Sequence, residues 1–473
     1  MSTGAASGTA NIAGVAPDAG VRAAGTQAPV IRTVSFLDSL LYTVLQVVPS
    51  YTQGLFTRNA SWVSFWARVH PDPLGVRLLS SWKRKYGAEL LYVSMLGSKS
   101  LLVLEPAGIR RALDNSPHIY GDAKLKRKGM SHFQPDAVTI SRGDAWRDRR
   151  RFNEAVLDAG TSSAEYTTRF LGVIQSETAR CLTDAGTVLR WQHIQDLFDR
   201  ITLRVVFGDR ARDDAALLGV LKALMRESNR VVGLKTSRHF NDLYSRVRAY
   251  LQSPEEGSLA ALCAHVPATE ETRIESQIPH WLFAMDETLA ANTARALALI
   301  SAHRESEVRV RREMGDVDLS TPEGIQALTY LEGCIYESMR LWPTTPLLAR
   351  ELLTEDTMGG ATIPAGTQVL IPSGFLHRDP EAVPHANTFS PEAWASGASG
   401  SGGERDYRFN HFSNGSQVCP GEPLALFVAK AVLASLLSGN RYTLRRPQLD
   451  VMRPLPHAYD YFKLVLSRED LHG

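Results

Sequence analysis

Cysteine is scarce in this sequence, and long apolar runs are missing. The chain of 473 residues has only four cysteines, which follow neither a paired spacing nor a zinc-like pattern: Cys181, Cys263, Cys334 and Cys419. This scatter argues against a disulfide framework and favours a reducing compartment. No apolar stretch is long enough to cross a bilayer, so we expect no transmembrane span.

An excess of charge of one sign is also missing. The net charge is +2 at pH 7, which gives no reason to expect nucleic acid or a strongly acidic partner. Large apolar side chains are nearly absent from the first thirty or so residues, so we expect residues 1–32 to be disordered. They also lack the basic start and apolar run of a secretory signal. With 44% apolar residues in the chain, residues 33–473 can form one mostly helical domain.

The first structured element is expected at residues 36–48, where apolar pairs repeat at helical spacing. The segment is too short to span a bilayer. It either rests on a membrane surface or packs on the core of its own domain. We favour packing on the core, because few basic residues flank the segment.

A small β region is predicted next. Residues 89–95 and 100–104 are rich in branched and aromatic side chains and flank Gly97-Ser98, which predicts a hairpin. No glycine-rich turn joins a strand to a helix, which argues against a Rossmann fold. Residues 121–140 are polar and predict an irregular loop.

Cys419 stands directly before an apolar run over 423–437 that predicts a helix. Phe412 and Gly415 precede the cysteine and Gly421 follows it, so the chain reaches the sulfur through a tight loop. Backbone N–H groups in such a loop and the positive end of the helix favour a thiolate. A thiolate held in this way beside an aromatic ring suits the axial position on haem iron.

The pattern Phe412-x-x-Gly415-x-x-x-Cys419-x-Gly421 resembles the cysteine-ligand loop of the cytochrome P450 family. Further segments resemble this family, in order, over roughly residues 75 to 470. The resemblance implies the mainly α fold of the family with a small β region in a single domain. It also implies haem b (iron protoporphyrin IX) as the cofactor.

The resemblance implies a set of haem contacts, with the iron bound to the cysteine. Trp146 and Arg150 stand four apart on one predicted helical face and are expected to reach a haem propionate, as is Arg350. Gln417 stands where the family usually has Arg or His, so one propionate contact is expected to be weaker or to be supplied elsewhere. The expected contacts are Trp146, Arg150, Ala284, Arg350, Phe412, Gln417, Cys419 and Gly421.

Three arginines beside Arg150 are expected to face outward: Arg147, Arg149 and Arg151. With Lys430 they would form a basic patch that docks a redox partner, or else an ordinary solvated face.

Glu337 and Arg340 stand three apart on a predicted helix, where their side chains can pair. The resemblance implies that this pair is structural. Ala393 stands where the family usually has an arginine that joins the pair, so a third partner must come from elsewhere.

The distal wall of the haem site is expected on a helix over 278–300, in one of two registers. The first keeps Glu287 and Thr288 as the acid and the alcohol that deliver protons. The second puts Asn292 where the alcohol belongs. We favour the second, because residues 293–297 then continue the small and apolar pattern of the family. Several residues of both registers share one face: Ala284, Thr288, Ala291, Asn292 and Arg295.

The resemblance implies a cytochrome P450 monooxygenase that activates O2 and hydroxylates or oxidatively couples a hydrophobic small molecule. The expected substrate contacts are Phe133, Trp281, Phe283, Leu347, Leu348 and Tyr459. A soluble, bacterial-type, cytoplasmic monomer is expected, with electrons from a ferredoxin and its reductase.

Two alternatives remain open. One is a peroxide-using peroxygenase, in which Arg295 on the distal helix could hold an acid group. The other is a non-enzymatic haem sensor, which ought to carry a signalling domain that is not visible in the sequence.

Overall fold

The computed structural model describes residues 30–95, 97–230, 237–394 and 405–471. Helices make up most of this part of the chain. They are α1 (Phe36–Tyr42), α2 (Val48–Thr52), α3 (Ala60–Val69), α4 (Asp72–Tyr86), α5 (Pro106–Asp114), α6 (Lys124–Met130), α7 (Gly143–Ser162), α8 (Ala164–Ala185), α9 (Trp191–Phe207), α10 (Ala215–Ser228), α11 (Arg238–Gln252), α12 (Leu259–Cys263), α13 (Ile274–Phe283), α14 (Leu289–Ala302), α15 (Arg304–Gly315), α16 (Pro322–Gln326), α17 (Thr329–Leu341), α18 (Ser373–Leu376) and α19 (Glu422–Leu437).

Within the described residues the strands form three sheets, with orders β1-β2-β3-β9-β6-β4, β10-β11-β5 and β7-β8. Their bounds are β1 (Arg32–Thr33), β2 (Leu90–Met95), β3 (Ser98–Val103), β4 (Tyr120–Asp122), β5 (Val188–Arg190), β6 (Leu348–Leu352), β7 (Asp356–Met358), β8 (Ala361–Ile363), β9 (Gln368–Ile371), β10 (Asn440–Arg446) and β11 (Val465–Asp470). The predicted hairpin is confirmed, since β2 and β3 pair antiparallel with Leu90 opposite Val103. Residues 1–29, which make up most of the segment expected to be disordered, lie outside the described residues, and Arg32 pairs with Leu91.

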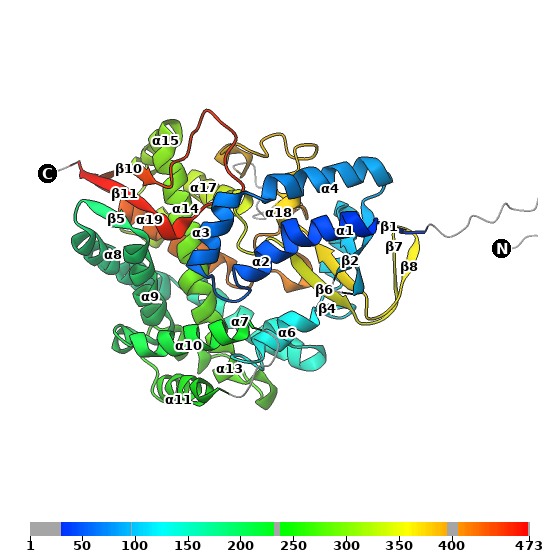
Figure 1. The fold of residues 1–473 in the computed structure, drawn as a ribbon. Helices are drawn as coiled ribbons and strands as arrows, with labels where there is room; N and C mark the ends of the chain where they lie inside the picture. Colours follow the sequence, from blue (N-terminus) through cyan, green and yellow to red (C-terminus); the bar gives the residue numbers. More distant parts are fainter. Residues whose placement is uncertain (1–29, 96, 231–236, 395–404, 472–473) are drawn as a thin grey trace, which may run out of the picture.

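Apolar side chains gather in two cores. One fills the helical body around α9, α14, α17 and α19, and the other lies between the six-stranded sheet and helices α1, α4 and α5. In Figure 1 helices α1 and α4 and this sheet lie toward one side of the molecule, and β10, β11 and β5 lie at the opposite side. Helix α14 is buried along nearly its whole length. Its sequence is mostly apolar or small, as a helix inside a core requires, with Asn292 and Arg295 as the large polar exceptions.

The segment expected to be an irregular loop is more ordered than the sequence indicated. Residues 121–140 contain part of β4, the lysine-rich helix α6 and a 3-10 turn, η2 (Val138–Ile140). The sequence of α6, Lys-Leu-Lys-Arg-Lys-Gly-Met, has no apolar periodicity. A periodicity argument therefore could not find this helix.

The helix expected over 36–48 is present as α1, the π-helical turn η1 (Thr43–Val47) and the start of α2. Only part of it packs on the core: Tyr42 is fully buried against Trp82, and Ser39 accepts a hydrogen bond from β2. The expectation that the apolar pairs face the core was wrong for most of them, because the helix buries the face that carries Ser39 and Tyr42. The side chains left exposed are Phe36, Leu37, Leu40, Leu41, Val44 and Val48.

Two members of the predicted basic patch are buried, which corrects that prediction. Arg149 is 6% exposed and donates to the Glu271 carbonyl oxygen and to the hydroxyl of Ser141 at 2.8 Å each. Lys430 is 4% exposed and pairs with Glu332 at 2.8 Å. Both cations can be buried because acceptors from distant segments, Glu271 for Arg149 and Glu332 for Lys430, compensate their charge or hydrogen-bonding groups.

The predicted Glu337–Arg340 pair lies fully buried on α17. Glu337 also accepts hydrogen bonds from the Ser390 backbone N–H at 2.8 Å and the Trp394 indole N–H at 3.1 Å. These two N–H donors take the place of the arginine that the family usually has at the position of Ala393. Arg340 donates further to the carbonyl oxygens of His377, His385, Ala386 and Thr388.

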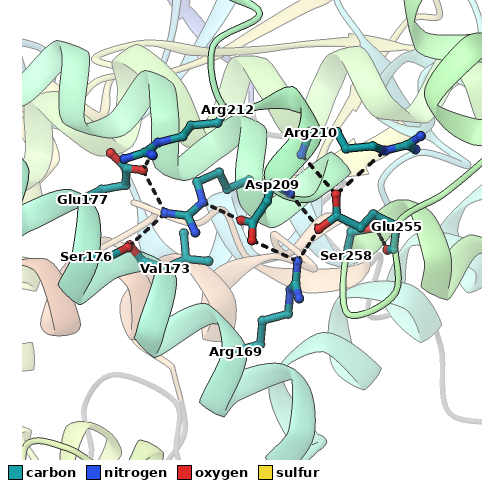
Figure 2. Close-up of polar contacts among 10 residues, drawn as sticks. Arg169, Val173, Ser176, Glu177, Asp209, Arg210, Arg212, Glu255 and Ser258 are labelled. Carbon is teal, nitrogen blue, oxygen red and sulfur yellow. Dashed lines mark hydrogen bonds and ion pairs between the residues drawn. The ribbon is translucent and has the colours of Figure 1, made fainter.

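A second polar network joins α8, α9 and the 3-10 turn η3 (Asp209–Ala211), as Figure 2 shows. Glu177, fully buried, accepts a hydrogen bond from Arg204 at 2.8 Å and pairs with Arg212 at 2.7 Å. Arg204 also donates to Asp209 at 2.7 Å, which lowers the pKa of that carboxyl. The backbone N–H of Asp209 donates to Glu255 at 2.9 Å. The network thus ties three helical elements to the loop before α12.

Glu177→Gln should destabilise the fold, because it leaves the cations of Arg204 and Arg212 without the buried carboxylate. We expect the free energy of unfolding to fall by roughly 3 kcal/mol, as when one partner of a buried ion pair is removed. Denaturant titration of the haem-loaded protein measures the change. Glu256→Gln makes the same substitution at an exposed position and should change the stability by less than about 0.5 kcal/mol. Equal stability of the two variants would contradict a role for the network.

Candidate functional site

A cavity of ≈ 370 Å³ lies where the loop before α19 meets α7, the α13–α14 helix and the start of β6. Cys419 is the only one of the four cysteines among its lining residues; Cys181, Cys263 and Cys334 are buried elsewhere in the described chain. Segments from both ends of the sequence complete the walls, with Thr57 from before α3 and Tyr461 from before β11.

The loop that carries Cys419 is tightly closed. The Cys419 backbone N–H donates to the Phe412 carbonyl oxygen at 2.8 Å, and the Val418 N–H donates to the Gly415 oxygen at 3.0 Å. Gly415 has φ +65°, and a Cβ there would lie 2.4 Å from the Leu113 carbonyl oxygen. Only glycine meets both constraints. The spacing of the loop residues therefore has a steric cause.

Burial and the loop backbone act in opposite directions on the Cys419 thiol. Burial raises the pKa of Cys419 to about 11, and the opposing hydrogen bond from the Gly421 backbone does not compensate. The loop shapes and shields the sulfur, and a bound metal ion has to displace its proton.

All of the residues expected to contact haem line this cavity: Trp146, Arg150, Ala284, Arg350, Phe412, Gln417, Cys419 and Gly421. Arg150 donates through Nε to Glu154 at 2.6 Å and through Nη1 to the Val418 carbonyl oxygen at 2.5 Å. Arg350 is 3% exposed, and its Nε donates to the Ser116 hydroxyl at 3.2 Å. In both arginines Nη2 has no acceptor among the described residues and is available to an anionic group.

The residues around the cavity fit a haem. Next to Cys419, the side chains of Asn410, His411 and Ser413 line the cavity and hold buried polar atoms without a partner in the described chain. Cations for two carboxylates come from Arg150 on α7 and Arg350 on β6. A flat apolar group with acidic edges matches this combination of a sulfur ligand, cations and an apolar wall.

The long helix beside the cavity is interrupted. Helix α13 passes into the π-helical turn η5 (Ala284–Thr288), where Asp286 has φ −74° and ψ −107°, and then into α14. A π-turn shifts the helical register locally. Residues of both predicted registers therefore line the cavity: Ala284, Glu287, Thr288, Ala291, Asn292 and Arg295.

Comparison with known proteins agrees with this geometry. The family model for Cytochrome P450 matches residues 263–458. The chain is 28% identical over 391 residues to cyclooctat-9-en-7-ol 5-monooxygenase from Streptomyces melanosporofaciens, covering 76% of this chain and 83% of the relative. It is 31% identical over 170 residues to cytochrome P450 4c3 from Drosophila melanogaster, covering 35% of this chain and 31% of that protein.

A solved structure shares the fold. Retinoic acid bound cyanobacterial CYP120A1 superposes with a TM-score of 0.68 at 18% identity, covering 83% of this chain and 94% of the other. The chain belongs to the cytochrome P450 family. It is a haem-thiolate monooxygenase with haem as its cofactor, and such P450s take electrons from a redox partner.

The P450 brings only some of the expected substrate contacts to the cavity. Trp281, Phe283 and Leu348 line it. The other expected contacts, Phe133, Leu347 and Tyr459, are not among the residues that line this cavity. Phe133 is fully buried, with its ring 6.3 Å from that of Phe283. Tyr459 stacks on Trp342 at 4.7 Å.

Leu347, the remaining expected contact, packs against the core beneath the six-stranded sheet. Leu348 packs against the same core and also lines the cavity, whereas Leu347 does not line it.

Among the cavity residues of this P450 that were not predicted from the sequence are Thr57, Arg58 and Tyr461. All three contact Glu287. Glu287 accepts hydrogen bonds from the Thr57 hydroxyl at 2.7 Å, the Arg58 backbone N–H at 3.1 Å and the Tyr461 hydroxyl at 3.2 Å. Thr57 and Arg58 lie far from Glu287 in the chain, and no local pattern marks them.

Asp286, also missed, points away from the cavity. It is 3% exposed, accepts a hydrogen bond from Gln195, and pairs with Lys222 at 3.1 Å. Burial and the nearby Asp199 raise the pKa of Asp286 well above its ordinary value. The signal in the sequence was an acid directly before Glu287 in a mostly apolar helix. These contacts hold the kink of η5 against α9 and α10.

Among the described residues Cys419 is the one cysteine that lines the cavity, so we expect it to be the iron ligand. Cys419→Ser should remove the absorption band of thiolate-ligated ferrous haem with carbon monoxide, because no other cysteine reaches the cavity. Absorption spectra of the reduced, carbon monoxide-bound protein measure this. Cys263→Ser, at a buried position away from the cavity, should keep the band. Persistence of the band in Cys419→Ser would contradict the assignment.

Proposed function

We propose that this P450 uses O2 and electrons from a ferredoxin system to hydroxylate or oxidatively couple a hydrophobic small molecule. The observation that carries the proposal is the cavity, in which Cys419 shares one space with apolar side chains such as Phe56, Phe283 and Leu348. The Streptomyces relative is named for oxidising an alkenol, which supports a hydrophobic substrate. We further propose that residues 33–473 form the single P450 domain, acting as a monomer in a reducing compartment such as the cytoplasm.

The experiment is substrate turnover under defined electron supply. Product should form from a hydrophobic substrate only with O2, NADPH, a ferredoxin and its reductase together. Equal turnover with hydrogen peroxide alone would favour a peroxygenase, and haem redox or gas binding without any turnover would favour a sensor.

When bound, haem supplies the reductive activation of O2. The residues of this chain would hold it in place. Cys419 would ligate the iron, and Arg150, Arg350, Trp146 and Gln417 would bind the propionates. The guanidinium groups of Arg150 and Arg350 are each partly bonded within the protein, so their positions are fixed before the haem enters.

We propose that Thr288 delivers the proton that oxygen activation consumes. Its hydroxyl lines the cavity and bonds to no described residue, whereas the Thr293 hydroxyl is tied to the Leu289 carbonyl oxygen at 2.9 Å. The π-turn that frees it from the usual helical bonding supports this role. Asn292, favoured by the sequence pattern alone, is the competing candidate, and its side-chain oxygen lies 3.5 Å from Arg295.

Thr288→Ala should therefore divert electrons into hydrogen peroxide. We expect coupled product formation to fall by roughly 10²-fold, the contribution of one positioned proton donor, while substrate affinity and the haem spectrum stay unchanged. Product and peroxide measured per NADPH consumed give the result.

Two further variants complete the test. Thr293→Ala removes the same hydroxyl from the same helix, outside the cavity, and should remain coupled. If Asn292→Ala uncouples and Thr288→Ala does not, Asn292 holds the proton-delivery position instead.

We propose that the redox partner docks beside the cysteine loop, near the exposed arginines Arg147 and Arg151. The two flank Arg150 on α7, which contacts the Val418 carbonyl oxygen, one residue from Cys419. Their side chains are 61% and 47% exposed, although each pairs with an acid of its own helix. Electron transfer needs a short path to the iron, and a ferredoxin is acidic enough to favour a basic face.

The double variant Arg147→Glu/Arg151→Glu should slow reduction by ferredoxin by roughly tenfold at low ionic strength and flatten its salt dependence. Stopped-flow reduction of the substrate-bound enzyme measures both. Arg180→Glu reverses a similarly exposed arginine, paired within α8, and should change neither. Unaltered rates in the double variant would show Arg147 and Arg151 to be an ordinary solvated face.

A further inference from the structure

Arg295 on α14 is a cation inside the cavity wall with too few acceptors. Its side chain lines the cavity and the residue is only 9% exposed. Nη1 donates to the Trp342 carbonyl oxygen at 2.9 Å and lies 3.5 Å from the Asn292 side-chain oxygen. Nε is buried without any partner in the described chain. A guanidinium has five N–H donors, so most of its bonding capacity is unused.

No acid among the described residues forms an ion pair with Arg295. Glu287 attracts the guanidinium only through space, and this attraction is smaller than the opposing effect of burial. The guanidinium carbon lies 4.8 Å from the centre of the Tyr461 ring. Burial lowers the pKa of Arg295 to about 10, and the nearby Arg58 adds to this effect. The side chain is still charged at neutral pH, so a buried cation faces the cavity.

The neighbouring acid is already occupied. Glu287 lies on the same helix but accepts hydrogen bonds from Thr57, Arg58 and Tyr461. Arg58 differs from Arg295 because its two terminal nitrogens donate to the carbonyl oxygens of Gly54 and Thr344, each at 2.5 Å. Of these two arginines, Arg295 is therefore the one that has N–H groups without hydrogen-bond acceptors in the described chain.

In the proposed arrangement the haem propionates do not accept hydrogen bonds from Arg295. The groups proposed for its propionates, Trp146, Arg150, Arg350 and Gln417, belong to α7, β6 and the cysteine loop. Arg295 instead lies beside Trp342 and Tyr461. The remaining occupant of the cavity is the substrate.

We propose that Arg295 binds a carboxylate of the substrate, so that the enzyme oxidises an apolar carboxylic acid held with its acid group against α14. A carboxylate matches the planar fork of guanidinium donors and neutralises the buried charge. The apolar body of the substrate then lies against Phe56, Phe283 and Leu348. This inference rests on the proposed function, whose substrate class it narrows.

Matched ligand pairs test the proposal in the haem-loaded enzyme. Dodecanoate and dodecanol, and retinoic acid and retinol, differ only in the group offered to Arg295. Their dissociation constants come from the shift of the haem absorption band. In the wild-type protein we expect each acid to bind at least about tenfold more tightly than its alcohol, as expected for a charge-assisted pair. Equal affinities in the wild-type protein would overturn the proposal without any variant.

Variants then locate the anion site. Arg295→Met should abolish the preference for acids while haem content, the carbon monoxide band and alcohol affinity stay unchanged, and Arg295→Lys should keep part of it. Arg58→Met is the matched control and should keep the preference. Loss of preference in Arg58→Met but not in Arg295→Met would overturn the assignment.

Failure of this inference can be told apart from failure of the proposed function. Binding to the ferric enzyme needs neither O2 nor a ferredoxin, so a preference for acids would persist in an enzyme that gives no turnover. Conversely, O2-dependent turnover of neutral alkenols without any preference for acids would leave the proposed function intact and refute the role of Arg295.

Discussion

The buried ion pair between Glu337 and Arg340 is the interaction on which the rest of the haem site depends. Arg340 gathers carbonyl oxygens from residues 377–388, and Glu337 gathers donors from Ser390 and Trp394. Two opposite charges removed from water are tolerated only when nearly every lone pair and proton finds a partner. The pair therefore imposes one path on the chain that leads into the cysteine loop.

Contacts of the same network reach Glu422, which follows the cysteine loop. The Trp394 ring stacks on Tyr336 at 5.2 Å, and the Tyr336 hydroxyl donates to Glu422 at 2.8 Å. Glu422 begins α19, three residues after Cys419, and also pairs with Arg405 at 2.8 Å. Helix α17 thus positions both the approach to the sulfur and the helix that follows it. Because the missing arginine at 393 is replaced by an indole N–H and a backbone N–H, the network keeps its function with neutral donors.

The charged residues of the α13–α14 helix, unlike the pair on α17, are not all compensated within the described part of the protein. Asp286 faces away from the cavity toward Lys222, Glu287 is surrounded by three donors, and Arg295 is left short of acceptors. A π-turn makes this possible, since it turns two successive acids to opposite sides of one helix. The helix can then anchor itself with one acid and shape the cavity with the other. A structure in which every cavity charge was paired would leave a ligand nothing polar to recognise.

The sequence by itself determined the family and the ligand loop, and the residues expected around the haem all line the cavity. The ligand loop and the pair on α17 could be predicted because they depend on short spacings. Gly415 must sit four residues before Cys419 for the loop to close against Leu113, and Glu337 and Arg340 must stand three apart to pair. Only the tertiary structure decided which side chains are buried. Arg149 and Lys430 are charged and helical, yet acceptors from distant segments enclose them. Thr57 and Tyr461 reach Glu287 from opposite ends of the chain. Burial and long-range contacts depend on how elements pack together, and no local spacing records that.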